Sequence, residues 1–398
     1  MTRLARLAVA LTGLLAVVAS PLTTVTAGAV ALSAGSPNSG NCTAQRPTNW
    51  PTGDGEQGAV FQCKYSQDGL TRTSWVYQPM SWNSLKPAPV VVVLHGCTEQ
   101  GPDIAYISRF DVEAERRGMI VVYPNQADFT STGTTTFDGN GSHCWNWFLP
   151  QGQARGAGEP ALIAGLTREA VAQWHGDQAR TFVIGISAGG ATSDIMAATY
   201  PDIFAATAIL AGCEYRGLPC LAAPAALPPL VSAQLTYQAS GGHARVVPFM
   251  VENGDVDPVV PVANALEITQ QWQYADDYAA HHGTLSSPVV SAPCAQQVVV
   301  PSSPVDTSQS PPAVRNPYDV YYFSASGAAC PQATSSPAAA LGELWIVHGE
   351  FHAWPGGPAL TTPEPYTNPG GPNFTRAATD FFLAHPCRVL RGVCAPAA

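Results

Sequence analysis

The stretch TFVIGISAGG, residues 181–190, decides how the chain must fold. Its first half is a short apolar run rich in β-branched residues, which is typical of a buried parallel strand. The run ends in a G-x-S-x-G pattern around Ser187, and residues 191–200 have the composition of a helix that Pro201 closes. Strand, tight turn and helix in this order predict a nucleophile elbow, in which a strained turn exposes a serine hydroxyl.

The remaining apolar runs place this turn in a longer alternating pattern. Continuous apolar runs predict buried strands, and apolar residues at helical spacing predict helices between them. The expected strands lie at 90–94, 119–123, 204–210, 246–251 and 344–347, and the expected helices at 107–117, 160–175, 261–281 and 374–383. Residues 62–77 alternate like two opening antiparallel strands. We therefore expect an α/β fold with a mostly parallel central sheet that helices cover on both faces.

The pattern around Ser187 is weak alone, because a plain Gly-rich turn between a strand and a helix would look the same. An activated serine also needs a base, an acid that orients the base, and N–H donors for the oxyanion. Asp257 and His352 follow the last two expected strands, on loops where open α/β sheets place their chemistry. We predict a catalytic triad of Ser187, Asp257 and His352.

Both partners of the serine have rivals close by. Asp255 competes with Asp257, and Glu252 is the next candidate; either would otherwise be a solvated turn carboxylate. Asp257 is preferred because the Pro-Val-Val after it leads directly into the next helix. His348 competes with His352, but it directly follows its strand, where a structural hydrogen bond is the simpler interpretation.

The loop after the first central strand reads His-Gly-Cys and ends at Cys97. Its position predicts that the backbone N–H of Cys97 forms an oxyanion hole with that of Ala188. Cys97 could instead be a thiolate nucleophile, but export of the chain and the presence of Cys144 favour a structural disulfide.

Three tryptophans near these loops, Trp145, Trp147 and Trp354, are candidates for an aromatic substrate platform. Burial in the core would explain them equally well. Glu159, at the start of an expected helix, could cap that helix or contact substrate, and capping is the preferred interpretation.

Residues 1–27 have the features of a secretory signal peptide. Two arginines form a positive n-region, residues 7–19 are apolar, and Val-Thr-Ala at 25–27 offers a cleavage site. A membrane anchor is the alternative, but the apolar run is short and breaks at a Ser-Pro pair. We expect a secreted protein with a polar N-terminal arm at 28–57 and a single catalytic domain at 58–398.

All ten cysteines follow the expected signal peptide, and an even number in an exported chain argues for disulfides. Sequence does not fix their connectivity, but loop closure favours near neighbours. The expected pairs are Cys42–Cys63, Cys97–Cys144, Cys213–Cys220, Cys294–Cys330 and Cys387–Cys394. A metal site is disfavoured, because the sequence has no C-x-x-C pairs or matched histidines.

Residues 283–340 are rich in Pro, Ser and Ala and are too long for an ordinary loop. We expect them to form an insertion in the catalytic domain, which Cys294 and Cys330 staple into a cap near the site.

The charge of the chain excludes some partners. The formal net charge is −10, and Lys64 and Lys86 are the only lysines. Nucleic acid and anionic membrane surfaces are therefore poor partners. No stretch after the signal peptide is long and apolar enough to span a bilayer. A neutral or insoluble substrate outside the cell is compatible with this balance.

Five motifs follow one another along the chain: HGCT at 95–98, CWNWF at 144–148, GAGEPALI at 156–163, GISAGG at 185–190 and HAWPGG at 352–357. Together they resemble the extracellular polyhydroxybutyrate (PHB) depolymerase-like esterases, a family related to feruloyl and acetylxylan esterases. The resemblance covers residues 75–382. It implies an α/β-hydrolase fold, the triad named above, Cys97 in the oxyanion loop, and hydrolysis of carboxylic esters without a metal or organic cofactor.

The resemblance implies a short-chain polyhydroxyalkanoate or its oligomers as the first substrate hypothesis. Feruloyl or acetyl esters of polysaccharides and the diketones of oxidised polyvinyl alcohol are the alternatives. A non-enzymic binding module would normally lack a member of the triad. Secreted depolymerases of crystalline polyester usually carry a linker and a separate polymer-binding domain, whereas this chain stops at Ala398 and has the long insertion at 283–340. These two departures from the family leave action on crystalline polyhydroxybutyrate open. The oligomeric state is left open.

Overall fold

The computed structural model describes residues 41–51, 56–67, 70–127, 142–224, 227–286, 293, 295–301, 305–306, 313–324, 340–359 and 366–395. The expected signal peptide and the first part of the expected arm lie outside these residues, as does the expected pair Cys294–Cys330.

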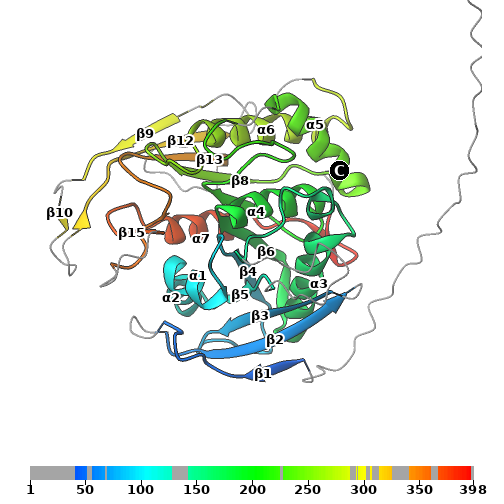
Figure 1. The fold of residues 1–398 in the computed structure, drawn as a ribbon. Coiled ribbons are helices and arrows are strands. Elements are labelled where there is room, and N and C mark those ends of the chain that lie inside the picture. Colours follow the sequence, from blue (N-terminus) through cyan, green and yellow to red (C-terminus); the bar gives the residue numbers. More distant parts are fainter. Residues whose placement is uncertain are drawn as a thin grey trace, which may run out of the picture. The chain divides into compact units, whose positions relative to one another are not determined.

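An eleven-stranded sheet organises the described part of the chain (Figure 1), in the order β1-β2-β3-β5-β4-β6-β7-β8-β13-β12-β9. Its strands are β1 (Cys42–Ala44), β2 (Ala59–Gln67), β3 (Leu70–Gln78), β4 (Ala88–Leu94), β5 (Ile120–Pro124), β6 (Gly176–Ile186), β7 (Thr207–Leu210), β8 (Phe249–Gly254), β9 (Ala295–Val299), β12 (Tyr318–Ser324) and β13 (Ala340–Val347). Three pairs lie outside it: β10 (Val305–Asp306) with β11 (Ala313–Val314), β14 (Trp354–Pro355) with β15 (Thr367–Asn368), and β16 (Val389–Leu390) with β17 (Val393–Cys394).

The direction of the strands changes across the sheet. From β5 through β4, β6, β7 and β8 to β13, neighbours are parallel. At one edge β1, β2, β3 and β5 pair antiparallel, and at the other β13, β12 and β9 do the same. The expected α/β fold class is confirmed, but the sheet is mixed: the parallel arrangement is confined to its centre.

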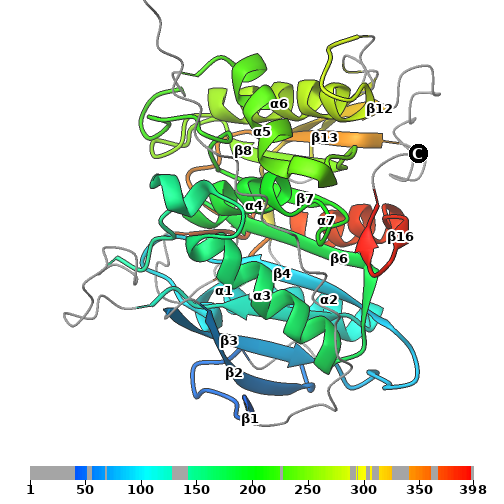
Figure 2. The same ribbon diagram turned by 90° about the vertical axis from the view of Figure 1, so that its right-hand side faces the viewer.

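Helices cover both faces of the central strands (Figures 1 and 2). They are α1 (Gly101–Ser108), α2 (Phe110–Arg117), α3 (Gly158–Gln173), α4 (Ala188–Thr199), α5 (Pro229–Ser240), α6 (Ala263–Ala280) and α7 (Phe374–Ala384), with short 3₁₀ turns η1 (Pro150–Gln153) and η2 (Gly241–His243). Because side chains alternate along a strand, Val91 and Val93 of β4 pack toward α1, α2 and α7, whereas Val90 and Val92 pack toward α3 and α4. This double burial explains why β4 is apolar throughout.

Two elements differ from the sequence prediction. The helix expected at 107–117 is two helices, because Arg109 adopts a left-handed backbone (φ 56°) and ends α1 before α2 begins. The described residues of the Pro- and Ser-rich segment expected as a cap include β9 and β12, which extend the sheet next to β13.

Four of the expected disulfides form in the structure: Cys42–Cys63, Cys97–Cys144, Cys213–Cys220 and Cys387–Cys394. The first joins β1 to β2, and the last closes the β16–β17 hairpin. Among the described helices, none has both the length and the apolar character that crossing a membrane requires.

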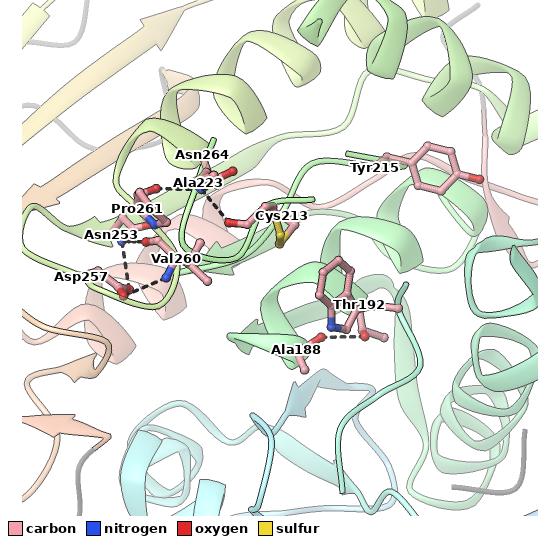
Figure 3. Close-up of a disulfide and its surroundings, with 12 residues drawn as sticks. Ala188, Thr192, Cys213, Tyr215, Ala223, Asn253, Asp257, Val260, Pro261 and Asn264 are labelled. Atoms are coloured by element: carbon pink, nitrogen blue, oxygen red, sulfur yellow. Dashed lines mark hydrogen bonds between the residues drawn. A yellow bond between two sulfur atoms is a disulfide. The ribbon is translucent and has the colours of Figure 1, made fainter. Parts of the chain in front are cut away.

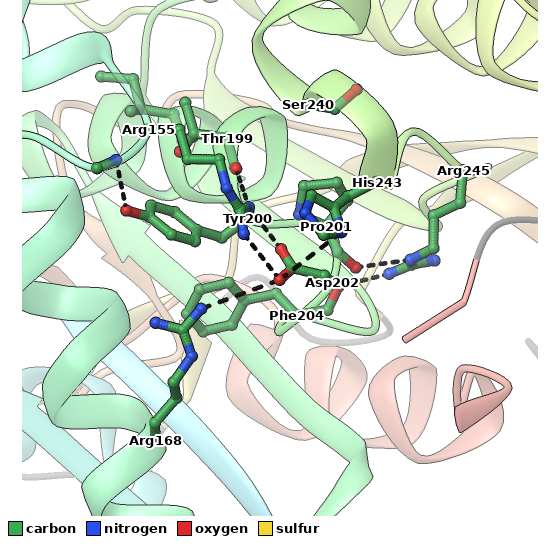
Figure 4. A network of polar contacts seen from close by, with 12 residues as sticks. Arg155, Arg168, Thr199, Tyr200, Pro201, Asp202, Phe204, Ser240, His243 and Arg245 are labelled. Carbon is green, nitrogen blue, oxygen red and sulfur yellow. Dashed lines mark hydrogen bonds and ion pairs between the residues drawn. The ribbon is translucent and has the colours of Figure 1, made fainter. Parts of the chain in front are cut away.

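A buried carboxylate fixes the chain where it leaves α4 (Figure 4). Both oxygens of Asp202 accept hydrogen bonds from the guanidinium of Arg155, at 2.6 and 2.9 Å, and Arg168 lies 3.9 Å away. Burial alone would raise the pKa of Asp202, but the Arg155 hydrogen bonds and nearby positive charge outweigh it and lower the pKa. The network ties the far end of the elbow helix to α3.

Candidate active site

Ser187 lies between β6 and α4 in a strained backbone conformation (φ 59°, ψ −123°). Two glycines make this turn possible. A Cβ on Gly185 would lie 2.4 Å from the carbonyl oxygen of Gly189, and one on Gly189 would lie 2.2 Å from the carbonyl oxygen of Leu94. The serine is half-buried, and its N–H donates to the carbonyl of Leu210 at 3.0 Å. The local geometry is that of the elbow that the sequence predicts.

Asp257 and His352 form a buried pair. Asp257 lies after β8 and His352 lies in the loop after β13, and the His352 Nδ1 to Asp257 Oδ2 distance is 2.7 Å. The carboxylate is held from its other side, because the backbone N–H groups of Val259 and Val260 donate to Oδ1 at 2.7 and 2.9 Å. Asn253 adds a 3.3 Å contact from its Nδ2 to Oδ2 (Figure 3). A proton on His352 Nδ1 that faces this carboxylate leaves Nε2 as the acceptor nitrogen.

Ser187 and His352 line one pocket of about 160 Å³. Its other lining residues are Gly96, Cys97, Glu99, Trp147, Ile186, Ala188, Cys213, Leu221, Val259, Val260 and Tyr366. The walls are therefore mainly apolar, and Glu99, Ser187, His352 and Tyr366 supply the polar side chains. The structure brings the expected nucleophile, base and oxyanion-hole residues to this pocket, with Asp257 behind the histidine.

The backbone donors of the expected oxyanion hole come from two elements. Ala188 is the first residue of α4. The first N–H that makes a helical hydrogen bond is that of Ala191, which donates to the Ser187 carbonyl, so the Ala188 N–H lies before the helical ladder begins. Cys97 lies in the loop after β4, and its disulfide to Cys144 braces that loop. Glu99 adds a second support, because its Oε2 accepts the Gly96 N–H at 2.8 Å.

His95 is a structural residue of the same loop. Its Nδ1 lies 2.7 Å from the Gly96 carbonyl oxygen, and its Nε2 accepts the Gln126 N–H at 3.1 Å. Burial lowers the pKa of His95 to about 4, so the ring is neutral at ordinary pH. A neutral ring with its proton on Nδ1 satisfies both contacts.

The rival residues pair with each other away from the pocket. Asp255 Oδ2 lies 2.9 Å from His348 Nδ1, and both side chains are exposed by about a third. Glu252 is buried, and neither it nor Asp255 is among the residues that line the serine pocket.

The three tryptophans do not form a common platform. Trp147 lines the pocket, next to the exposed ring of Phe148. Trp145 and Trp354 are fully buried, and their indole N–H groups donate to the His95 carbonyl and to Thr375 Oγ1. The expectation for these two is corrected: they support the His-Gly-Cys loop and the core, because a buried indole needs an internal acceptor.

Glu159 neither caps its helix nor reaches the pocket. Its carboxylate accepts hydrogen bonds from the Asn146 N–H at 2.6 Å and from Asn146 Nδ2 at 2.8 Å, and Arg72 lies 3.5 Å away. Burial raises the pKa of Glu159, against the opposing effect of these partners. This carboxylate holds the segment that carries Trp145 and Trp147.

Sequence reasoning missed the supporting contacts of Glu99, Asn253 and Tyr366, which are tertiary. The proximity of Glu99 to the His-Gly-Cys loop and of Asn253 to Asp257 was the available signal. The ring of Tyr366 packs edge-on against His352, and nothing in the sequence around Tyr366 indicates this contact. No group of three or more His, Cys, Asp or Glu side chains suited to a metal ion occurs among the residues that the structure describes.

The sequence profile of the Esterase PHB depolymerase family matches residues 74–287, more than half of the chain. The chain belongs to the PHB depolymerase esterase family. Poly(3-hydroxyalkanoate) depolymerase C of Paucimonas lemoignei is 31% identical over 213 residues, which cover 51% of this family member and 47% of the relative. Feruloyl esterase B of Neurospora crassa is 34% identical over 204 residues, covering 47% and 64% of the two chains.

Acetylxylan esterase A of Aspergillus awamori is 27% identical over 232 residues, covering 53% of this chain and 70% of the relative. The chain therefore spans about half the length of the depolymerase and about two thirds of the length of the feruloyl esterase that it matches. The solved structure of an acetyl xylan esterase from Aspergillus awamori superposes with a TM-score of 0.56 at 19% identity, over 74% of this chain and 94% of that one. This likeness shows a shared fold.

Proposed function

We propose that the chain is a secreted serine esterase that hydrolyses carboxylic esters, with Ser187 as nucleophile, His352 as general base and acid, and Asp257 as the residue that orients the imidazole. One observation carries the proposal: Ser187 and His352 line the same pocket, while His352 Nδ1 lies 2.7 Å from Asp257 Oδ2. Family membership and the disulfides support the esterase activity and the oxidising environment.

The proposed reaction proceeds in two halves. Ser187 Oγ attacks the ester carbonyl carbon and passes its proton to His352 Nε2, while the N–H groups of Cys97 and Ala188 donate to the oxyanion. The tetrahedral intermediate collapses, the alcohol leaves with the proton from His352, and an acyl group remains on Ser187. A water molecule, deprotonated by His352, then releases the acid and restores the serine.

A short-chain polyhydroxyalkanoate, or its oligomers, is the proposed substrate. The pocket walls of Ile186, Leu221, Val259 and Val260 offer apolar contacts to a short aliphatic acyl unit and few hydrogen bonds to a sugar. The similarity to a relative named as a polyhydroxyalkanoate depolymerase agrees with this choice.

A feruloyl or acetylxylan ester is the second candidate, and Trp147 favours it. Its ring lines the pocket and packs edge-on against Phe148, with 5.7 Å between centroids, and 44% of Phe148 is exposed. Such a pair suits stacking with a feruloyl ring or a sugar face. The oxidised polyvinyl alcohol alternative has no residue in the pocket that favours it specifically.

The test compares the protein with its Ser187→Ala variant on p-nitrophenyl butyrate, emulsified amorphous PHB and feruloylated arabinoxylan. We expect the variant to lose roughly 10⁴-fold or more in kcat, because the nucleophile is absent. Clearing of the emulsion by the wild type alone supports the polyester, and ferulate release without clearing supports the second candidate. Ser66→Ala, at an exposed serine in β2, is the matched control. Butyrate hydrolysis that survives Ser187→Ala would falsify the mechanism.

A further inference from the structure

Two buried glutamates lie behind the proposed triad and take no part in its chemistry. Glu252 belongs to β8, and Glu350 lies in the loop after β13, two residues before His352. Each is about 1% exposed. We call these two side chains the carboxyl pair.

The end of β8 and the His352 loop meet at the carboxyl pair. The parallel register of β8 and β13 places Val347 opposite Gly254, so the chain after β13 crosses the end of β8. The backbones are in tight contact there, since a Cβ on Gly254 would lie 2.1 Å from the Glu350 carbonyl oxygen. The N–H of Val256 donates to that same carbonyl at 3.3 Å.

The side chains of the carboxyl pair lie close enough to form a hydrogen bond with each other. Two carboxylates offer only acceptors, so one of the two must carry a proton for this bond to form. Glu350 Oε2 already accepts a hydrogen bond from Asn368 Nδ2 at 2.5 Å, which makes Glu350 the natural acceptor and Glu252 the donor. In the described part of the chain, neither oxygen of Glu252 accepts a hydrogen bond from any donor, and neither does Oε1 of Glu350.

The charges around the carboxyl pair favour retention of this proton. The negative charges of Asp255 and Asp257 act on the pair. His348 and His352 contact those two aspartates through their Nδ1 atoms. Burial first, and then the negative charge of Glu350 and Asp257, raise the pKa of Glu252 well above its ordinary range. A second negative charge in this buried place is therefore strongly disfavoured at neutral pH.

We propose that Glu252 and Glu350 are positioning residues, and that the proton they share fastens the loop of His352 to the end of β8. The pair acts between two other contacts of the same loop: Gly349 N–H to Asp255 Oδ1 at 2.7 Å, and His352 to Asp257. Loss of the proton in alkaline solution leaves two carboxylates in contact and releases the loop. The expected effect on catalysis rests on the proposed function above, whereas the expected protonation of Glu252 does not.

The test uses Glu252→Gln, whose amide N–H donates to Glu350 where the acid did but has no proton to lose. We expect the wild-type kcat/KM for p-nitrophenyl butyrate to fall in alkaline solution, and the midpoint of this fall to move up by about one pH unit or more in Glu252→Gln. Glu343→Gln, at a buried carboxyl of β13 that faces Trp345, is the matched control and leaves the midpoint in place. Glu252→Ala lowers kcat at pH 7 more than it raises KM.

A second measurement does not depend on activity. The folded protein keeps the Glu252 proton and the unfolded chain releases it, so stability falls as pH rises above the ordinary glutamate pKa of 4.5. Between pH 6 and pH 8 the wild type is therefore expected to release about one proton more on unfolding than Glu252→Gln does. Superimposable activity profiles and equal proton release in the two proteins would overturn the proposal. A wild type without esterase activity overturns the proposed function instead, and proton release still tests the carboxyl pair.

Discussion

The molecule has two His–Asp pairs that join the end of β8 to the loop after β13, and only one of them faces the serine. Asp257 and His352 are buried, and their carboxylate accepts hydrogen bonds from two backbone N–H groups and Asn253. Asp255 and His348 have nearly the same separation, 2.9 Å, but are exposed by about a third. A short His–Asp contact therefore does not by itself identify a catalytic pair. Burial, a fixed carboxylate and a serine in the same pocket distinguish the proposed catalytic pair.

Removing each histidine in turn is the most direct test of which His–Asp pair is catalytic, and it has the largest expected effect. His352→Ala should lower kcat for p-nitrophenyl butyrate by roughly 10⁶-fold, because neither proton transfer can occur. His348→Ala should change kcat by less than about threefold, since its pair is exposed and weak. Circular dichroism checks that both variants fold. A larger loss for His348→Ala would reverse the assignment.

Substitutions of the two aspartates should also lower kcat unequally, but the difference between them should be smaller than for the histidines. Asp257→Asn should lower kcat by roughly 10⁴-fold, because an amide at this position favours the wrong imidazole tautomer. Asp255→Asn retains an oxygen that accepts the Gly349 N–H, so we expect kcat within about threefold of the wild type. Steady-state kinetics of both variants, measured at one pH, decide between the two carboxylates; equal losses would mean that the pairs act together.

The smallest expected effect is on the stability of the fold, and it concerns the exposed pair of His348 and Asp255. The hydrogen bond that His348 Nδ1–H donates to Asp255 outweighs burial and raises the pKa of His348 above its ordinary 6.5. A raised histidine pKa stabilises the fold below pH 6.5, and this contribution is lost as pH rises through the raised value. His348→Gln should therefore be less stable than the wild type at pH 5.5, by under about 1 kcal/mol, and equally stable at pH 9. Urea unfolding at the two pH values measures this; a difference that grows with pH contradicts it.

Local patterns carried the parts of the fold that sequence could predict. The elbow around Ser187 was predictable because its glycines, its strand and its helix are adjacent in the chain. Asp257 and His352 were predictable candidates because each follows an apolar strand. The break at Arg109 was not, because nothing in its neighbours demands a left-handed residue.

The direction in which a side chain points was harder to predict than its place along the chain. Trp145, Trp147 and Trp354 have the same affinity for apolar surroundings, yet only Trp147 lines the pocket. The hydrogen-bond acceptors that hold the other two, His95 and Thr375, are distant in sequence. Tyr366 and the contact between Glu252 and Glu350 were hidden for the same reason, since both depend on how the loops after β8 and β13 meet.

The disulfide between Cys97 and Cys144 has a consequence for where the protein becomes competent. It braces the loop of the proposed oxyanion hole, whereas Ser187, Asp257 and His352 are positioned without any cysteine of their own. A chain that folds in a reducing cytoplasm would carry the three residues but an unbraced loop. Oxidation that forms this disulfide would therefore complete the brace of the loop.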